Sequence, residues 1–165
     1  MDGKDVNVNM YIKPGRVIVK KDPGIMSTVV GSAVAVCIWD RISRFGGVCH
    51  YIYPEMMDKN KTTVNYGNVA IYVLVKSMKE FGSRQDDLET QIFGGAEPRI
   101  AYDHRGTYGP QNVKIARKVL NKYGIKITSE DTGGHFGRKI SFNTDTNEVM
   151  VYKVEQLRKD DWHFL

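Results

Sequence analysis

Cysteine is scarce in this chain of 165 residues, which contains only Cys37 and Cys49. Two cysteines are too few for a disulfide framework, and no Cys/His spacing in the chain is typical of a zinc site. In a reducing compartment both are expected to be free thiols. Cys37 stands in an apolar run and is expected to be a small core residue. We therefore expect no metal, and nothing in the sequence implies a cofactor.

Long hydrophobic runs are also missing. The longest apolar stretch, residues 28–39, contains Gly31 and Ser32 and is too short to cross a bilayer as a helix. Residues 1–5 are polar and do not provide the apolar centre of a signal peptide. These absences predict a cytoplasmic protein with no inserted membrane segment.

A concentrated patch of one charge is absent as well. The net charge is +5, but basic residues alternate with acidic ones, as in Lys20-Lys21-Asp22 and at 158–161. Nucleic-acid binders usually gather their positive charge on one face or interleave it with aromatic residues. The pattern favours a solvated, mixed surface over nucleic-acid binding, which would show an affinity that falls steeply with salt.

What the chain does contain is a series of short apolar segments separated by turn residues. Helical spacing predicts helices over 66–81 and 111–123, each ended by a glycine. In the first, Val69, Tyr72 and Val73 are expected on the buried face, widened by Ile71, Leu74, Val75 and Met78. Alternation and turn signals predict strands at 7–12, 16–20, 25–30, 33–39, 45–53, 88–93, 125–131, 139–143 and 148–154.

This pattern predicts one α+β domain over residues 1–165, with mixed and antiparallel sheets and two main helices. No repeat, long linker or low-complexity tract divides the chain. Residues 155–165 form a charged and aromatic tail, in which Trp162 and Phe164 either dock on a surface or remain disordered.

The two most apolar strands are expected to pair as a hairpin around residues 40–44. If the loop centres near 42 and 43, Ala35 lies opposite His50, and position 33 lies diagonally from His50 on the same face. A slip of one residue would place them on opposite faces, and Gly46-Gly47 could supply a bulge. From the residues alone, a half-buried His50 bonded to backbone is the simpler interpretation.

The segment Ser27-Thr28-Val29-Val30-Gly31-Ser32-Ala33, followed by Cys49-His50-Tyr51, closely resembles the active-site hairpin of the CheD family. Members of that family are chemoreceptor glutamine deamidases of bacterial chemotaxis. Further segments resemble the family in the same order, so that the similarity covers about residues 16–154: Ile92-Phe93-Gly94-Gly95-Ala96, Asn112-Val113, Glu130-Asp131-Thr132-Gly133-Gly134 and Val151-Tyr152-Lys153-Val154.

The resemblance implies a CheD-like cysteine hydrolase fold and a protein-glutamine glutaminase that acts on methyl-accepting chemotaxis receptors. A CheC-type phosphatase is the implied regulatory partner. In the family a cysteine attacks the glutamine carboxamide and a histidine, here His50, moves the proton. The family's third catalytic residue, a threonine six positions before the cysteine, corresponds to Ser27. Thr28 is its neighbour, and either hydroxyl could orient His50 or the substrate.

The nucleophile position itself is Ala33, and a methyl group has neither a lone pair nor a proton to give. The chain is therefore expected to be inactive as given, whether the alanine was introduced or is natural. Cys49 adjoins His50 but should point to the opposite face of the strand, so it cannot replace the missing thiol. The alternative is a non-catalytic CheD-fold binding module for a chemoreceptor or a CheC-type phosphatase.

The remaining candidates are less specific. Thr28, Ser32, Gly94 and Gly95 are possible substrate-binding residues, because they flank the nucleophile position or form tight turns near it. His104 and His135 are expected in solvated loops. Asp131 is expected to position a loop backbone.

Overall fold

The computed structural model describes residues 9–98 and 108–155, which form two sheets and two α-helices. The predicted tail, with Trp162 and Phe164, and the predicted loop residue His104 lie outside the described residues. The elements are β1 (Asn9–Tyr11), β2 (Arg16–Lys20), β3 (Ile25–Val30), β4 (Val34–Asp40), β5 (Phe45–Tyr51), α1 (Gly67–Glu80), a 3₁₀ turn (Gln85–Asp87), β6 (Leu88–Gly94), α2 (Gly109–Lys122), β7 (Lys126–Thr132), β8 (Gly137–Asn143) and β9 (Val149–Val154).

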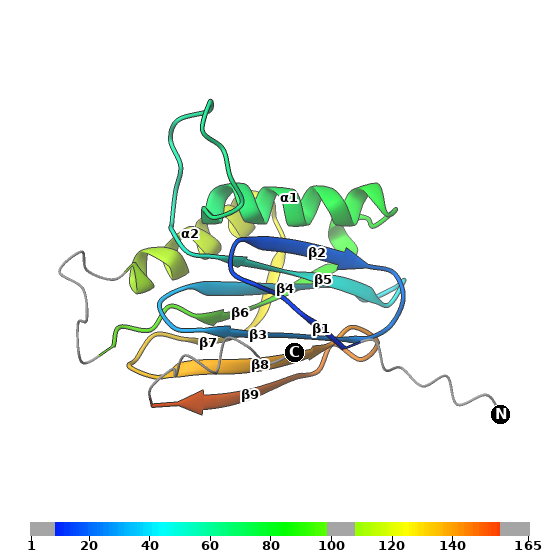
Figure 1. The fold of residues 1–165 in the computed structure, drawn as a ribbon. Helices are drawn as coiled ribbons and strands as arrows, with labels where there is room; N and C mark the ends of the chain where they lie inside the picture. The colour runs from blue at the N-terminus through cyan, green and yellow to red at the C-terminus, as the bar shows by residue number, and fades with distance from the viewer. Residues whose placement is uncertain (1–8, 99–107, 156–165) are drawn as a thin grey trace.

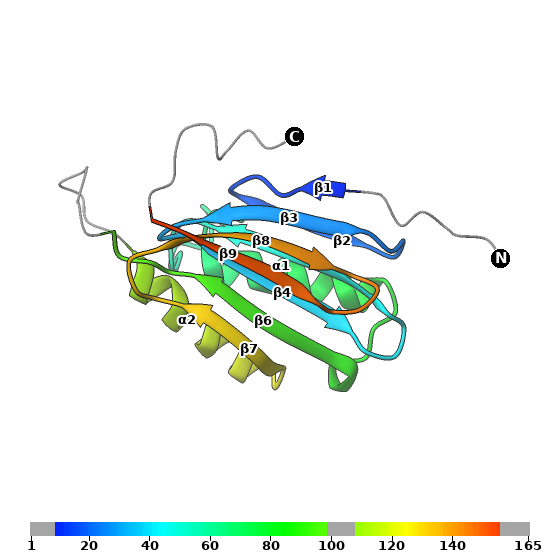
Figure 2. The ribbon, with the colours of Figure 1, turned by 90° about the horizontal axis from the view of Figure 1, so that it is seen from below.

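The strands form a five-stranded sheet in the order β2-β5-β4-β6-β7 and a four-stranded sheet in the order β1-β3-β8-β9. Most neighbours are antiparallel, but β1 pairs with β3, and β6 with β7, in parallel. Both helices cover one face of the five-stranded sheet, and the four-stranded sheet covers its other face (Figures 1 and 2). The predicted α+β class with mixed sheets is confirmed.

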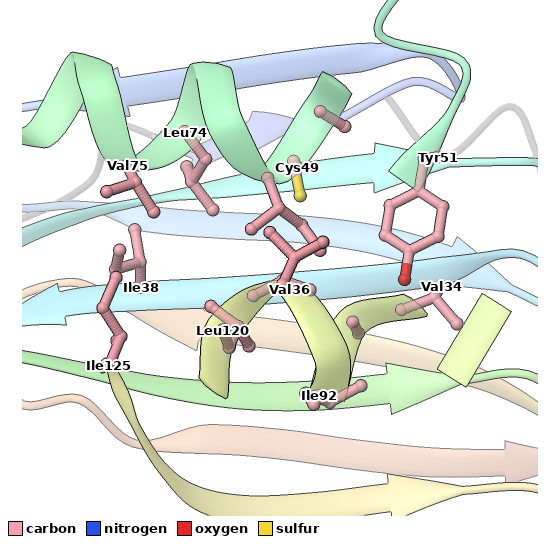
Figure 3. Packing of buried hydrophobic residues seen from close by; sticks show 14 of the residues in the cluster. Val34, Val36, Ile38, Cys49, Tyr51, Leu74, Val75, Ile92, Leu120 and Ile125 are labelled. Atoms are coloured by element: carbon pink, nitrogen blue, oxygen red, sulfur yellow. The ribbon is translucent and has the colours of Figure 1, made fainter. Parts of the chain in front are cut away.

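Two apolar layers result from this arrangement. The layer under the helices holds Val34, Val36, Cys49 and Tyr51 from the central strands together with the buried sides of α1 and α2 (Figure 3). The layer between the sheets holds alternate residues of the same strands, among them Ala33, Ala35, Cys37 and Val48. The central hairpin is therefore buried on both faces, as its continuous hydrophobicity predicts.

The predicted elements agree closely with the observed ones, and most ends differ by one or two residues. The buried face predicted for α1 was wrong at Val69, Tyr72 and Val73. Tyr72 is 49% exposed, and Val69 and Val73 are only partly buried. The fully buried stripe consists of Ala70, Ile71, Leu74, Val75 and Met78, with Gly67 at its start. Apolar residues occur around most of this helix, so the sequence alone does not show which face is buried. The packing of α1 against β5 and β2 decides it.

Candidate active site

The β4–β5 hairpin places position 33 and His50 on the face that meets the second sheet. Ala35 pairs with His50 and Val34 with Tyr51 in one continuous register from Asp40 to the strand ends. The expected pairing of Ala35 with His50 is thus confirmed, and the register has no bulge at Gly46-Gly47. Diagonal neighbours across such a pair have Cα atoms about 7–8 Å apart. Continued by one residue beyond Val34, the same register would make a side chain at position 33 such a diagonal neighbour of His50.

A chain of two hydrogen bonds fixes the tautomer of His50. The Thr28 hydroxyl donates to the carbonyl oxygen of Ile12 at 2.7 Å, and the same hydroxyl oxygen lies 2.8 Å from His50 Nδ1. Because its only hydrogen is directed to Ile12, the Thr28 oxygen must accept from Nδ1–H. Nε2 then carries the lone pair of a neutral imidazole, and it has no hydrogen-bond partner within the described residues.

Burial keeps this imidazole neutral. His50 is fully buried, and the loss of hydration lowers its pKa to about 4, although the backbone oxygen of Ile12 opposes the shift. At neutral pH the ring is therefore an unprotonated base with Nε2 as its basic atom. An imidazole held in this state can accept a proton from a thiol at position 33.

The two candidate hydroxyls of β3 point to opposite faces. Ser27 Oγ lies 3.1 Å from Ser141 Oγ, on the pleat opposite to Thr28. Thr28, which is 2% exposed, is the hydroxyl on His50. The geometry therefore favours Thr28 over the predicted Ser27 as the group that orients the histidine, and it leaves Thr28 little surface to offer a substrate.

A glycine turn closes the other side of position 33. The Gly95 amide donates to the Ala33 carbonyl at 2.9 Å, and the Ala96 amide donates to the Gly31 carbonyl at the same distance. Gly94 and Gly95 have φ of +110° and +69°, and a Cβ on Gly94 would collide with the Ala33 carbonyl oxygen. The predicted residues Gly94, Gly95 and Ser32 thus surround Ala33, whose own exposed fraction is 9%.

Comparison with known proteins shows the family of the chain. A family model described as CheD chemotactic sensory transduction matches residues 53–153. The chain is 35% identical over 147 residues to a probable chemoreceptor glutamine deamidase CheD of Sulfurimonas denitrificans, covering 88% of this chain and 94% of the relative. It is 34% identical over 142 residues to the chemoreceptor glutamine deamidase CheD of Thermotoga maritima, covering 85% and 88%. The chain belongs to the CheD family.

Two buried polar residues of this CheD-family site are not singled out as functional by sequence reasoning. Asn112, at the start of α2, donates from Nδ2 to the carbonyls of Ser32 and Ile52. Arg138, 3% exposed on β8, donates to the carbonyls of Gly133 and Phe136 and to Asp131. The sequence signal for Asn112 is its place in a segment that resembles the family, whereas nothing in the local pattern marks Arg138.

Four further candidates remain: Cys37, Cys49, His135 and Asp131. Cys37 and Cys49 are buried free thiols in different apolar layers, and burial raises the pKa of Cys49 to about 12. His135 is an exposed loop residue whose Nδ1 donates to the Glu97 carbonyl. Asp131 pairs with Arg138 and Lys153, so it anchors the end of β7.

No group of three or more metal-ligating side chains gathers within residues 9–98 and 108–155. Neither α1 nor α2, the two α-helices in that part of the chain, is long and apolar enough to cross a membrane.

Proposed function

We propose that this site is built for the deamidation of glutamine side chains in methyl-accepting chemotaxis receptors, and that the chain as given lacks only the nucleophile. The observation that carries the proposal is the neutral, buried His50, held by Thr28 at Nδ1 and, among the described residues, unpaired at Nε2, on the face it shares with position 33. The relatives named chemoreceptor glutamine deamidases support the same reaction.

With a cysteine at position 33, the proposed reaction has two halves. Nε2 takes the thiol proton, and the sulfur attacks the carboxamide carbon of glutamine to give a tetrahedral oxyanion. The C–N bond then breaks, the imidazolium returns its proton to the leaving ammonia, and a thioester remains. In the second half Nε2 takes a proton from water, whose oxygen attacks the thioester carbon. The C–S bond then breaks, the imidazolium returns its proton to the leaving sulfur, and glutamate and the free thiol remain.

Each neighbour of position 33 has a role in this scheme. Thr28 holds the histidine tautomer and takes the third catalytic position that the family pattern assigns to Ser27. The Gly94-Gly95 turn and Ser32 shape the approach to the reacting carbon. No metal or cofactor enters any step. We further propose that the protein acts in the cytoplasm, with a CheC-type phosphatase as partner.

In the chain as given, Ala33 cannot attack the amide. Loss of the nucleophile from such a unit typically leaves an acceleration of only ~10³–10⁴ over water, from binding and the remaining polar groups. We therefore propose that this form binds its target without turning it over. The methyl group at Ala33 also supports a second candidate, a CheD-fold binding module for a receptor or for a CheC-type phosphatase.

The test is a deamidation assay on a receptor cytoplasmic fragment, read residue by residue by peptide mass spectrometry. The chain as given is compared with Ala33→Cys under conditions in which both bind the fragment. Glutamine-to-glutamate conversion by Ala33→Cys alone supports the deamidase. Binding by both without conversion by either supports the binding module and contradicts the deamidase.

A further inference from the structure

Position 33 lies just beyond the end of the backbone ladder that holds the hairpin together. The last pair of β4 with β5 is Val34 with Tyr51. The next residue, Ile52, already turns away, since its amide donates to the Asn65 carbonyl in the loop before α1. No β4–β5 ladder bond therefore fixes position 33 relative to the strand that carries His50.

The side chain of Asn112 closes this gap. Both Nδ2 hydrogens are used, one on the Ser32 carbonyl at 2.9 Å and the other on the Ile52 carbonyl at 2.8 Å. Ser32 directly precedes the nucleophile position, and Ile52 follows His50 by two residues. Resting on the proposed function, we propose that Asn112 is a positioning residue of the deamidase site, which sets the distance between the nucleophile at position 33 and His50.

Asn112 is itself held from two further directions. Its amide donates to the Tyr108 carbonyl at 2.7 Å, within the first turn of α2. Its carbonyl accepts the hydroxyl of Tyr51 at 2.5 Å, and burial raises the pKa of that phenol, which therefore stays a donor. Tyr51 is the residue next to His50, so the strand and the helix start are tied directly together.

The side-chain oxygen of Asn112, Oδ1, indicates why an asparagine is present at this position. Asn112 is fully buried, and its Oδ1 has no partner in the part of the chain that the structure describes. An unpaired buried acceptor destabilises the folded state, and an apolar residue of the same size would avoid that cost. The two hydrogen bonds that Nδ2 donates, to the Ser32 and Ile52 carbonyls, offset this cost. A displacement of about 1 Å at reacting atoms can reduce a rate by ~10².

The experiment measures how strongly His50 assists a thiol at position 33, without any receptor present. Iodoacetamide alkylation of Ala33→Cys is compared with that of Ala33→Cys/His50→Gln, peptide by peptide, from about pH 6 to 8. The alkylation rate at position 33 in the first protein divided by that in the second measures how much His50 accelerates the reaction. We expect this ratio to be at least about tenfold. Cys37 and Cys49 serve in every variant as buried thiols whose protection reports the fold.

The ratio is then measured again with Asn112→Leu in both proteins, and with Asn121→Leu as the control on the exposed face of the same helix. We expect Asn112→Leu to reduce the ratio to below about threefold and Asn121→Leu to leave it unchanged. Tyr51→Phe, which removes one tie to Asn112 at almost constant volume, should reduce it partly. This second variant applies if Asn112→Leu fails to fold.

If Asn112 has only a structural role, Asn112→Leu lowers the stability but leaves the ratio of alkylation rates unchanged. That result overturns the inference. An unchanged ratio in Tyr51→Phe, where Asn112→Leu does not fold, overturns it too. If the ratio is already near one with Asn112 in place, the pairing of His50 with position 33 is absent. In that case the proposed function fails, and the role of Asn112 fails with it.

Discussion

At the scale of single residues, the pleat of two strands decides which side chains meet. The family pattern singles out Ser27 and leaves its neighbour Thr28 as an alternative, and only the pairing of β3 with β8 decides which of the two hydroxyls meets His50. That pairing directs Ser27 to Ser141 and Thr28 to His50. A sequence pattern fixes that neighbours in a strand face opposite ways, but not which of the two faces inward when both are small and polar.

His50 should make the stability of the folded chain depend on pH. Its pKa is lowered to about 4 by burial, against an unfolded value near 6.5. Between these values the unfolded state binds more protons, so the contribution of His50 is complete above the upper value and is lost as the pH falls through the window. The full loss is about 3 kcal/mol. About 2 kcal/mol of this loss falls between about pH 7 and about pH 4.5, and urea unfolding at these two values measures it.

His50→Gln is the matched variant for this titration, since glutamine does not ionise. The part of the pH dependence assigned to His50 should be absent from it, while the contribution of the carboxylates remains. Equal slopes in the two proteins over the window would show that His50 is not held neutral by burial.

The two natural thiols should be unreactive while the protein is folded. Both are buried, and burial raises the pKa of each, that of Cys49 to about 12. We expect iodoacetamide to modify neither under native conditions and both in urea, as counted by intact mass. Rapid native modification of Cys49 would contradict its place beneath the helices and would make it a possible substitute nucleophile.

At the scale of elements, the sequence predicts the strands and helices well and their partners poorly. The hairpins β4–β5 and β8–β9 follow from short loops between apolar runs. The parallel pairs β1–β3 and β6–β7 join segments whose connections carry no such signal. The pairing of β3 with β8, which places Thr28 in the four-stranded sheet, likewise joins segments far apart in the chain and has no such signal.

The turn of the β4–β5 hairpin is secured by Asp40. This buried carboxylate accepts the amides of Ile42 and Ser43 at 3.0 and 2.8 Å and the hydroxyl of Ser83 at 2.6 Å. Burial alone would raise the pKa of Asp40, but these hydrogen bonds outweigh it and lower the pKa. We predict that Asp40→Ala lowers the free energy of unfolding by about 2–4 kcal/mol, measured in urea.

Asp22→Ala is the control for this change, since Asp22 lies on an exposed bend. It should change the stability by no more than about 0.5 kcal/mol. If Asp40→Ala were equally harmless, the hairpin turn would not depend on the buried carboxylate.

The Gly94 turn is expected to be more sensitive than a comparable glycine elsewhere. Gly94→Ala places a methyl group against the Ala33 carbonyl and forces φ of +110° on a residue with a Cβ. Gly134 has φ of +66°, but a Cβ there would meet no atom within 4 Å, so Gly134→Ala carries only the backbone cost, about 1–2 kcal/mol. Urea unfolding should show a larger loss for Gly94→Ala. Equal losses would contradict the close approach of Gly94 to position 33.

At the scale of the whole molecule, the site lies where three layers meet. The five-stranded sheet supplies position 33 and His50, the four-stranded sheet supplies Thr28, and the helical layer supplies Asn112. The resemblance in sequence could point to His50 and Ala33, because they stand in one hairpin. It could name Thr28 only as an alternative to Ser27, and it could not reveal the contacts of Asn112, since the contacts of Thr28 and Asn112 span 22 and 80 residues along the chain.

The central claim is that a complete histidine site remains around a missing sulfur, and one comparison tests it most directly. The initial rate of receptor-fragment deamidation is measured for Ala33→Cys and for Ala33→Cys/His50→Gln at equal receptor occupancy. We predict turnover by the first and a rate lower by ~10²–10⁴ in the second, because the general base is gone. Equal rates in the two variants would contradict the claim, since the restored thiol would then act without His50.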